Sequence, residues 1–318
     1  MKKKLLFPCL LLTLAMLFAC LFTLGVSAAT VSMTDVAGGT APAAGDIVTI
    51  SNEAELKAFS KYVSDGGVTE GITFRLENDI ELTFDSKKSS GQYVTTLNPI
   101  GGTYNGAAEN VAFKGTFDGN GKAITNFNVT NVYVDATGAT KRDTKATVGG
   151  LFAAVDGGTV KDLTLGVYQI AQVGEANGAV AATANGATFL NCSVIVDSID
   201  TAAPVTQTNQ IALTKNTVSA LGGVVGVATD SVIDGCNVNI AIKGYQIVGG
   251  VVGVAENTAV RNCVAGGAYT NTQSSILGGV AGELKGTSTV KNCYSYAELD
   301  GKEKLGGVVG VVGVGKFW

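Results

Sequence analysis

The hexapeptide GGVVGV stands at Gly222–Val227, at Gly249–Val254 and again at Gly306–Val311. Each copy opens a longer unit, and the second unit reads GGVVGVAENTAVRNCVA. Related units start at Gly149, Asn177 and Gly278. The spacings between successive starts are 28, 45, 27, 29 and 28 residues. A near-constant period in this range indicates a solenoid, in which each unit buries its apolar face only against its neighbours.

Two other interpretations of the hexapeptide fit less well. A phosphate-binding loop needs a Lys and a Ser or Thr after its glycines, and no copy has them. A membrane helix needs about 20 unbroken apolar residues, whereas polar residues end each of the first two copies sooner. The motif therefore predicts one strand and corner of a recurring coil.

The composition limits the function classes. The 318 residues include 43 glycines, 4 prolines and only 15% charged side chains, which suits an all-β chain with many tight turns. The formal net charge of −4 disfavours nucleic-acid binding, because such proteins cluster Lys and Arg. Histidine is absent, which excludes HExxH metalloproteases and Ser–His–Asp hydrolases.

The N-terminus has the three regions of an export signal. Lys2–Lys4 precede the apolar run Leu5–Val26, and a small-residue cleavage pattern places the cut between Ala28 and Ala29. We therefore predict a signal peptide over residues 1–28 and a secreted or cell-surface protein. An uncleaved membrane anchor and a lipid-modified Cys20 are the alternatives, and membrane contact is expected only through an uncleaved leader.

Three further regions are expected. Residues 29–46 are rich in Gly, Ala and Thr, which predicts a flexible spacer. Residues 47–147 are expected to form a capping helix and the first coils, and residues 148–318 the repeats. The last unit, from Gly306, stops before its Asn–Cys corner. We interpret the chain as the N-terminal part of a longer surface protein, with a plug formed by the final aromatic residues as the alternative.

A single amphipathic helix is expected before the first coils. Asn52 with Glu55 three residues later predicts a capping box, and Leu56, Phe59 and Val63 form an apolar stripe. A helix at this place would cover the exposed sheet edge at the end of a solenoid.

A bend is expected next to the repeated cysteine. The residue before the cysteine is Asn191, Gly235, Asn262 or Asn292. Asn and Gly tolerate a left-handed backbone, so these positions predict a corner. Stacked coils would place the asparagines above one another, where their amides could form a hydrogen-bonded ladder.

The repeated cysteines are expected to be buried free thiols. They share one repeat position, at which the first unit has Leu163, and comprise Cys192, Cys236, Cys263 and Cys293. A position that accepts Leu is apolar, and free Cys behaves as a small hydrophobe. Two disulfides are the alternative, since stacked Cα atoms are close enough, but parallel side chains hold the Cβ atoms too far apart. Stacked ligands would not form the tetrahedron that zinc prefers.

Two ordered stretches carry a family resemblance. FKGTFDGNGKAI (Phe113–Ile124) and VGGLFAAVDGGTVKDLTL (Val148–Leu165), followed by the GGVVG and NC units, resemble the bacterial surface proteins that carry GLUG repeats. The resemblance covers the chain from about Ile50 onward. It implies a right-handed parallel β-helix on an exported, surface-associated protein. Some members join such repeats to a metallopeptidase domain, but the absence of histidine means that proteolysis does not carry over.

The sequence leaves two functions open. The first is a non-enzymatic surface solenoid, either a spacer or an adhesin-like module without catalytic residues, metal or cofactor. It would bind a host or matrix glycan or protein through loops at residues 83–96, 132–147 and 201–217. The second is a polysaccharide lyase or hydrolase, which would need paired carboxylates or a base beside Arg. The candidate acids are scattered and do not share one repeat position: Asp118, Asp156, Asp162, Asp230, Asp234 and Glu256.

Overall fold

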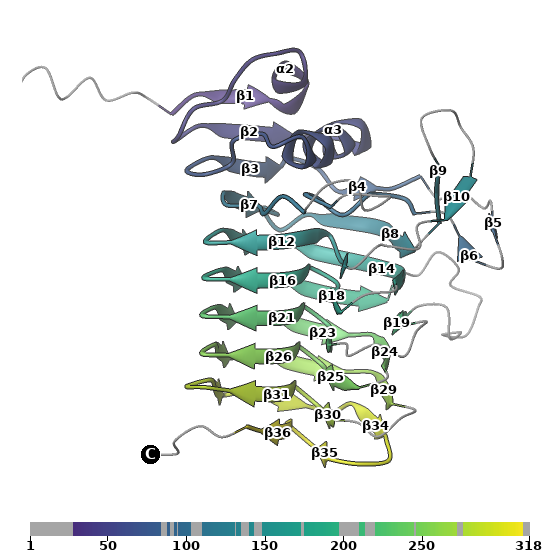
Figure 1. The fold of residues 1–318 in the computed structure, drawn as a ribbon. Helices are drawn as coiled ribbons and strands as arrows, with labels where there is room; N and C mark the ends of the chain where they lie inside the picture. Colours follow the sequence, from purple (N-terminus) through teal and green to yellow (C-terminus); the bar gives the residue numbers. More distant parts are fainter. Residues whose placement is uncertain are drawn as a thin grey trace, which may run out of the picture.

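The computed structural model describes residues 28–83, 88–89, 92–93, 95–102, 110–130, 132–134, 140–142, 148–172, 175–196, 210–213, 220–244, 246–271 and 276–313. Within these residues the chain winds into one stack of coils with two helices at its N-terminal end (Figure 1). Four sheets run along the stack, and their strands pair in parallel. The predicted parallel β-helix is confirmed. Residues 1–27 of the predicted leader lie outside the described residues.

One complete coil illustrates the architecture. It runs through β25 (Ile247–Gly249), β26 (Val252–Glu256), β27 (Ala259–Arg261), β28 (Val264–Gly266) and β29 (Ala268–Asn271). The next coil starts with β30, which pairs with β25 in the register that the repeats predict. We number the four sheets I to IV in the order in which a coil visits them, with β25 in sheet I and both β28 and β29 in sheet IV.

Each sheet is a column of equivalent strands. Sheet I contains β11 (Val148–Gly149), β15 (Ala176–Gly178), β20 (Ala220–Gly222), β25, β30 (Ile276–Gly278) and β35 (Leu305–Gly306). Sheet II contains β12 (Phe152–Asp156), β16 (Ala181–Asn185), β21 (Val225–Thr229), β26, β31 (Ala281–Lys285) and β36 (Val309–Val312). Sheet III contains β1 (Thr30–Ser32), β2 (Ile47–Ile50), β3 (Thr73–Leu76), β7 (Thr116–Asp118), β13 (Thr159–Lys161), β17 (Thr188–Leu190), β22 (Val232–Asp234), β27 and β32 (Thr289–Lys291).

Sheet IV divides into two columns. The long strand β14 (Thr164–Gln172) pairs along its length with β8 (Ala123–Thr130), which in turn pairs with β4 (Ile80–Glu81). On its other side β14 meets two strands, β18 (Ser193–Val196) and β19 (Gln210–Leu213). The first column continues through β23 (Asn237–Asn239), β28 and β33 (Tyr294–Ser295), and the second through β24 (Ala241–Gly244), β29 and β34 (Glu298–Asp300).

The GGVVGV motif forms the tight corner between sheets I and II. A Cβ atom on Gly249 would overlap the carbonyl oxygen of Val252. One on Gly250 would overlap the carbonyl oxygen of Gly279 in the next coil and lie 2.7 Å from the ring of Tyr269. Val251, between the two strands, is fully buried. The motif is therefore two strand ends and a corner, and its glycines are required by close backbone approach.

The core consists of side-chain columns along the axis. The large apolar position three residues before the cysteine is fully buried in Phe189, Ile233 and Val260. At the N-terminal end the same interior is filled by phenylalanines, and the ring centroids of Phe59 and Phe74 are 4.5 Å apart. Burial of this continuous apolar column is the main favourable contribution to folding.

The prediction of a flexible spacer over residues 29–46 is wrong. Strand β1 pairs in parallel with β2, and helix α2 (Met33–Ala37) follows it at once. The helix begins with a capping box formed by Ser32 and Asp35. Met33 and Val36 are buried, so this segment belongs to the cap. Five helical residues are too few to give a periodic signal in the sequence.

The predicted capping helix is confirmed as α3 (Glu53–Ser64), and its stripe of Leu56, Phe59 and Val63 is fully buried. The Asn52 side chain accepts from the Glu55 N–H at 3.0 Å. The Glu55 carboxylate accepts hydrogen bonds from Ser51 N at 2.6 Å and from Thr34 Oγ1 at 2.7 Å. In a capping box it would instead accept from the backbone N–H of Asn52. Glu55 thereby ties α3 to α2.

The helices in the described part of the chain are too short to span a membrane.

The predicted binding loops are only partly described. Residues 83–96 contain the antiparallel hairpin β5 (Lys88–Ser89) and β6 (Gln92–Tyr93), and residues 132–147 contain β9 (Val132–Val134) and β10 (Thr140–Arg142). Both hairpins project from one side of the stack (Figure 1). The segment 201–217 differs from the prediction, because β19 within it pairs with β14 and β24 as part of sheet IV. The rest of these three segments lies outside the described residues, apart from a few flanking positions.

We expect Gly250→Ala to destabilise the protein by at least about 2 kcal/mol, because the new methyl group meets the backbone of the next coil and the Tyr269 ring of its own coil. Gly307→Ala is the matched control. It occupies the same repeat position, and no atom lies within 4 Å of its added Cβ. Denaturant unfolding measures both variants. Equal stabilities would contradict the close-approach explanation.

Candidate functional site

The corner between sheets III and IV has the predicted left-handed backbone. The φ angles are 51° at Asn191, 66° at Gly235, 53° at Asn262 and 53° at Asn292. Asp162, at the same position in an earlier coil, has a φ of 52°. These short polar residues and glycine are the types that adopt this conformation at low cost.

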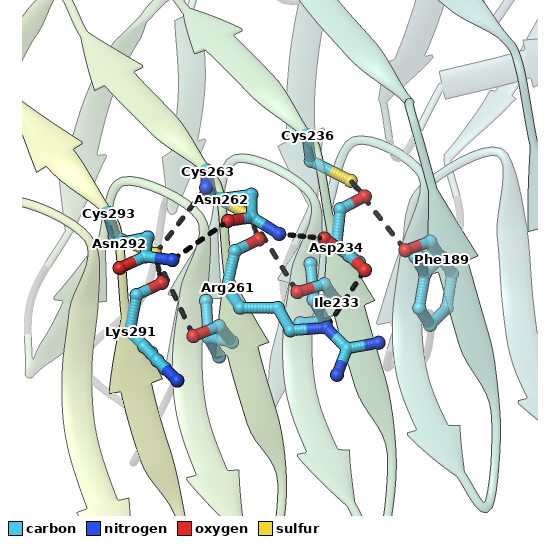
Figure 2. A network of polar contacts seen from close by, with 11 residues as sticks. Phe189, Ile233, Asp234, Cys236, Arg261, Asn262, Cys263, Lys291, Asn292 and Cys293 are labelled. Carbon is cyan, nitrogen blue, oxygen red and sulfur yellow. Dashed lines mark hydrogen bonds and ion pairs between the residues drawn. The ribbon is translucent and has the colours of Figure 1, made fainter.

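The predicted amide ladder is confirmed only in part. Asn292 Nδ2 donates to Asn262 Oδ1 at 3.3 Å, and Asn262 Nδ2 donates to Asp234 Oδ1 at 2.8 Å (Figure 2). Gly235 interrupts the column, so the carboxylate of the preceding Asp234 takes the place of an amide. Further along the stack, Asn191 Nδ2 donates to Asp162 Oδ1 at 3.0 Å.

A charged column runs beside this ladder on the outer face of sheet III. Lys161 Nζ lies 2.7 Å from Asp118 Oδ2 and 3.2 Å from Asp162 Oδ2. Arg261 Nε lies 2.8 Å from Asp234 Oδ2. The expected scatter of the candidate acids is wrong for Asp118 and Asp162. They differ in repeat position, but the coil stack brings both carboxylates to one lysine.

Lys161, Asp118 and Asp162 form a cluster (the Lys161 cluster) that stays charged at neutral pH. Desolvation is the largest effect on Lys161 and lowers its pKa, but the hydrogen bonds and charges of Asp118 and Asp162 together raise it above the ordinary value. The hydrogen bond from Asn191, followed by that from Lys161, lowers the pKa of Asp162. A general base or acid needs a pKa near the working pH. Both shifts move away from that range.

The other candidate acids lie at the corner between sheets II and III, namely Asp156, Asp230 and Glu256. Asp156 accepts from Asn185 Nδ2 at 2.9 Å. Among the described residues, no three His, Cys, Asp or Glu side chains gather so as to hold a metal ion.

The four repeat cysteines are free thiols, as predicted. Cys192, Cys236 and Cys263 are buried. Cys293 is only half-buried, which corrects the expectation that all four are inaccessible, because no described coil covers its open side. The thiol of Cys263 donates to the carbonyl oxygen of Arg261 at 3.1 Å.

Stacking keeps the thiols of Cys236, Cys263 and Cys293 protonated. The hydrogen bond with the Cys236 thiol, supported by desolvation, raises the pKa of Cys263 to about 12. The Cys192 thiol likewise raises the pKa of Cys236, and the Cys263 thiol raises that of Cys293. Desolvation raises both pKa values further. Since thiolates are the reactive form, these cysteines are structural.

A groove between α3 and residues 95–102 is lined in part by Lys57, Lys61 and Asn98. Its two lysines are already paired along the helix, Lys57 with Glu53 and Lys61 with Asp65, each at 2.6 Å. The groove therefore presents no free positive charge from α3.

The surface residues that the sequence analysis missed are Tyr294 and Tyr296. Their side chains are 62% and 51% exposed, and their ring centroids are 6.1 Å apart. In the preceding coil the paired position of Tyr294 is Val264, and the next outward position is Gly266. A comparison of outward-facing repeat positions would have identified this departure.

The fold defines a parallel β-helix protein. Its amide, carboxylate and lysine side chains at the corner of sheets III and IV form hydrogen bonds and ion pairs with one another along the stack. No family model matches the chain, and no curated protein matches it. The chain is similar to the solved structure of a "putative immunoglobulin A1 protease" from Bacteroides ovatus. That match has a TM-score of 0.57 and 17% identity, and covers 84% of this chain and 72% of the other. Identity this low supports a shared fold alone.

Replacing Asn262 tests the ladder. Asn262→Ala loses the hydrogen bond to Asp234 and puts alanine, which disfavours the left-handed conformation, at a position that requires it. We therefore expect the free energy of unfolding to fall by about 1–2 kcal/mol. Asn262→Gly keeps the backbone freedom and should lose less. Equal losses in chemical denaturation would contradict a backbone contribution.

The Asn262 effect should also depend on pH. The hydrogen bond from Asn262, followed by that from Arg261, lowers the pKa of Asp234 in the folded protein below its ordinary 3.8. The stabilisation is therefore complete above that value and is lost as the pH falls through the lower folded pKa. The stability difference between wild type and Asn262→Ala should narrow in acid.

Thiol labelling tests the cysteine column. In a chain that begins at Ala29, the native protein should label at Cys293 alone, slowly at neutral pH and faster as the pH rises, because its pKa is raised. Unfolding without reductant should expose all four thiols. Mass spectrometry locates the label. Absence of thiols after unfolding would contradict free cysteines, and native labelling of Cys236 would contradict its burial.

Proposed function

We propose that this chain is a non-enzymatic solenoid of the bacterial cell surface or its surroundings, related to the GLUG-repeat surface proteins, that acts as a spacer or adhesin-like module. The observation that carries the proposal is the use of its polar groups. Amides and carboxylates at the corner of sheets III and IV bond along the stack, from Asn191 to Asp162 and from Asn292 through Asn262 to Asp234. Such groups maintain the stack.

Export is supported at the predicted cleavage site. Ala29 N lies 2.9 Å from Asp46 Oδ1, and Ala43 N lies 2.8 Å from Asp46 Oδ2. Both hydrogen bonds lower the pKa of Asp46, and the one from Ala43 has the larger effect. Cleavage after Ala28 would place a positively charged amino group beside an ionised carboxylate. A charge-assisted hydrogen bond of this kind would anchor the mature N-terminus to the cap.

A polysaccharide lyase is the second candidate, and the cluster of Asp118, Lys161 and Asp162 is the observation that favours it. A lyase would use a lysine as the base that removes a proton from an acidic sugar. The raised pKa of Lys161 opposes this role. The protease description of the similar Bacteroides ovatus structure gives no second mechanism, because the likeness is in fold and this chain lacks histidine.

The test is turnover by the secreted protein. The chain is produced with its own leader, so that the mass of the product also shows whether it begins at Ala29. We expect no new reducing ends or unsaturated products from acidic and neutral polysaccharides, and no cleavage of immunoglobulin A. Wild type is compared with Lys161→Ala and with Lys291→Ala, a lysine of the same column in another coil.

Turnover that Lys161→Ala abolishes and Lys291→Ala preserves would overturn the non-enzymatic proposal in favour of the lyase. The predicted loop at 201–217 is tested separately by replacing residues 202–208 with a Gly-Ser linker, because a longer deletion would remove β19 from sheet IV. Binding of a host or matrix polymer that survives this replacement would clear that loop.

A further inference from the structure

Two tyrosines interrupt the repeat on the outer face of sheet IV. Positions Val194, Val238 and Ala265 are fully buried, so the residues on either side of them face outward. One outward column reads Thr164, Ser193, Asn237, Val264 and Tyr294. The other reads Gly166, Ile195, Asn239 and Gly266, and Tyr296 follows in the next coil.

The coil holds the Tyr296 ring close to the sheet. Tyr296 N donates to the carbonyl oxygen of Ala265 at 3.0 Å, which continues the strand pairing. A Cβ atom on Gly266 would overlap the Tyr296 ring, so the ring occupies the space that a side chain would fill in the neighbouring coil. The ring is thereby fixed at the surface and loses little further freedom when a ligand binds.

The pair forms an exposed aromatic platform. The two ring planes are inclined by 32°, and the centroids are 6.1 Å apart. Outward positions of sheet IV reach solvent in inner coils as well, since Asn237 and Asn239 are exposed with described coils on both sides. The exposure of Tyr294 and Tyr296 therefore belongs to the sheet face.

We propose that Tyr294 and Tyr296 form a binding site for a neutral oligosaccharide. The apolar C–H faces of sugar rings stack on aromatic rings, and the phenol hydroxyls add hydrogen bonds. Along the same columns the exposed carboxamides of Asn237 and Asn239 lie two strands away, about 10 Å at the usual strand spacing. An extended oligosaccharide spans that distance.

Charge selects a neutral ligand. The charged residues that follow the tyrosines within sheet IV are Glu298 and Asp300, and both are exposed and acidic. Aromatic faces also carry negative partial charge. Both features repel the carboxylates of an acidic polysaccharide, which is the substrate class that the lyase alternative would require.

This inference specifies the ligand class of the adhesin-like function and rests on that proposal. The full exported chain is titrated calorimetrically with neutral hexasaccharides of β-1,4-linked glucose and of mannose, and with an oligogalacturonate as the acidic counterpart. We expect binding of at least one neutral hexamer and weaker binding of the acidic one. Tyr294→Ala/Tyr296→Ala should weaken binding about tenfold or more, whereas Tyr294→Phe/Tyr296→Phe should retain it within about threefold.

Ile195→Ala is the matched control, since Ile195 is 38% exposed on the same face and should leave binding unchanged. Tyr294→Ala alone keeps the test decisive if the double variant unfolds, because Tyr294 is the more exposed ring. Absence of binding to both neutral hexamers, preference for the acidic one, or unchanged binding by the alanine variants would overturn the site. Failure here leaves a spacer intact, whereas turnover of a polysaccharide would refute the proposed non-enzymatic function itself.

Discussion

Parallel stacking in register is the constraint on which the rest of this molecule depends. Strand neighbours lie about 4.8 Å apart, so each residue of a coil rests on the residue at the same position in the coils before and after it. Gly249 pairs with Gly222 on one side and Gly278 on the other. A side chain that fits must therefore fit beside a near-copy of itself. The sequence repeats because its packing environment repeats.

This constraint explains the chemistry of the coil. Tight corners admit glycine alone where a Cβ would meet the carbonyl of the next coil, as at Gly250. Stacked thiols raise one another's pKa, which keeps Cys236 and Cys263 protonated and unreactive. Stacked amides and carboxylates at Asn262 and Asp234 satisfy one another along the axis. Groups used in this way serve the fold.

The outer faces escape the constraint, because a side chain that points to solvent need not fit a copy of itself. A change of residue type at an outward-facing repeat position therefore indicates a role other than packing between coils. Sheet III uses it for ion pairs such as that of Lys161 with Asp118. Sheet IV carries the tyrosines, and the hairpin of β9 and β10 leaves the stack on one side (Figure 1). A surface module of this architecture would bind its ligand through such departures from the repeat.

The sequence by itself determined the repeating part of the protein. The period, the glycines of Gly249–Val254, the bend at Asn262 and the apolar position of Cys263 all follow from local chemistry, which each unit states again. The tertiary structure decided what occurs once. Residues 29–46 became a cap because Met33 and Val36 find a buried surface at the end of the stack. Asp118 and Asp162 met at Lys161, and β19 joined sheet IV, through contacts between coils. A repeated pattern can be recognised in one dimension because each copy confirms the others, whereas a single long-range contact leaves no periodic trace in the chain.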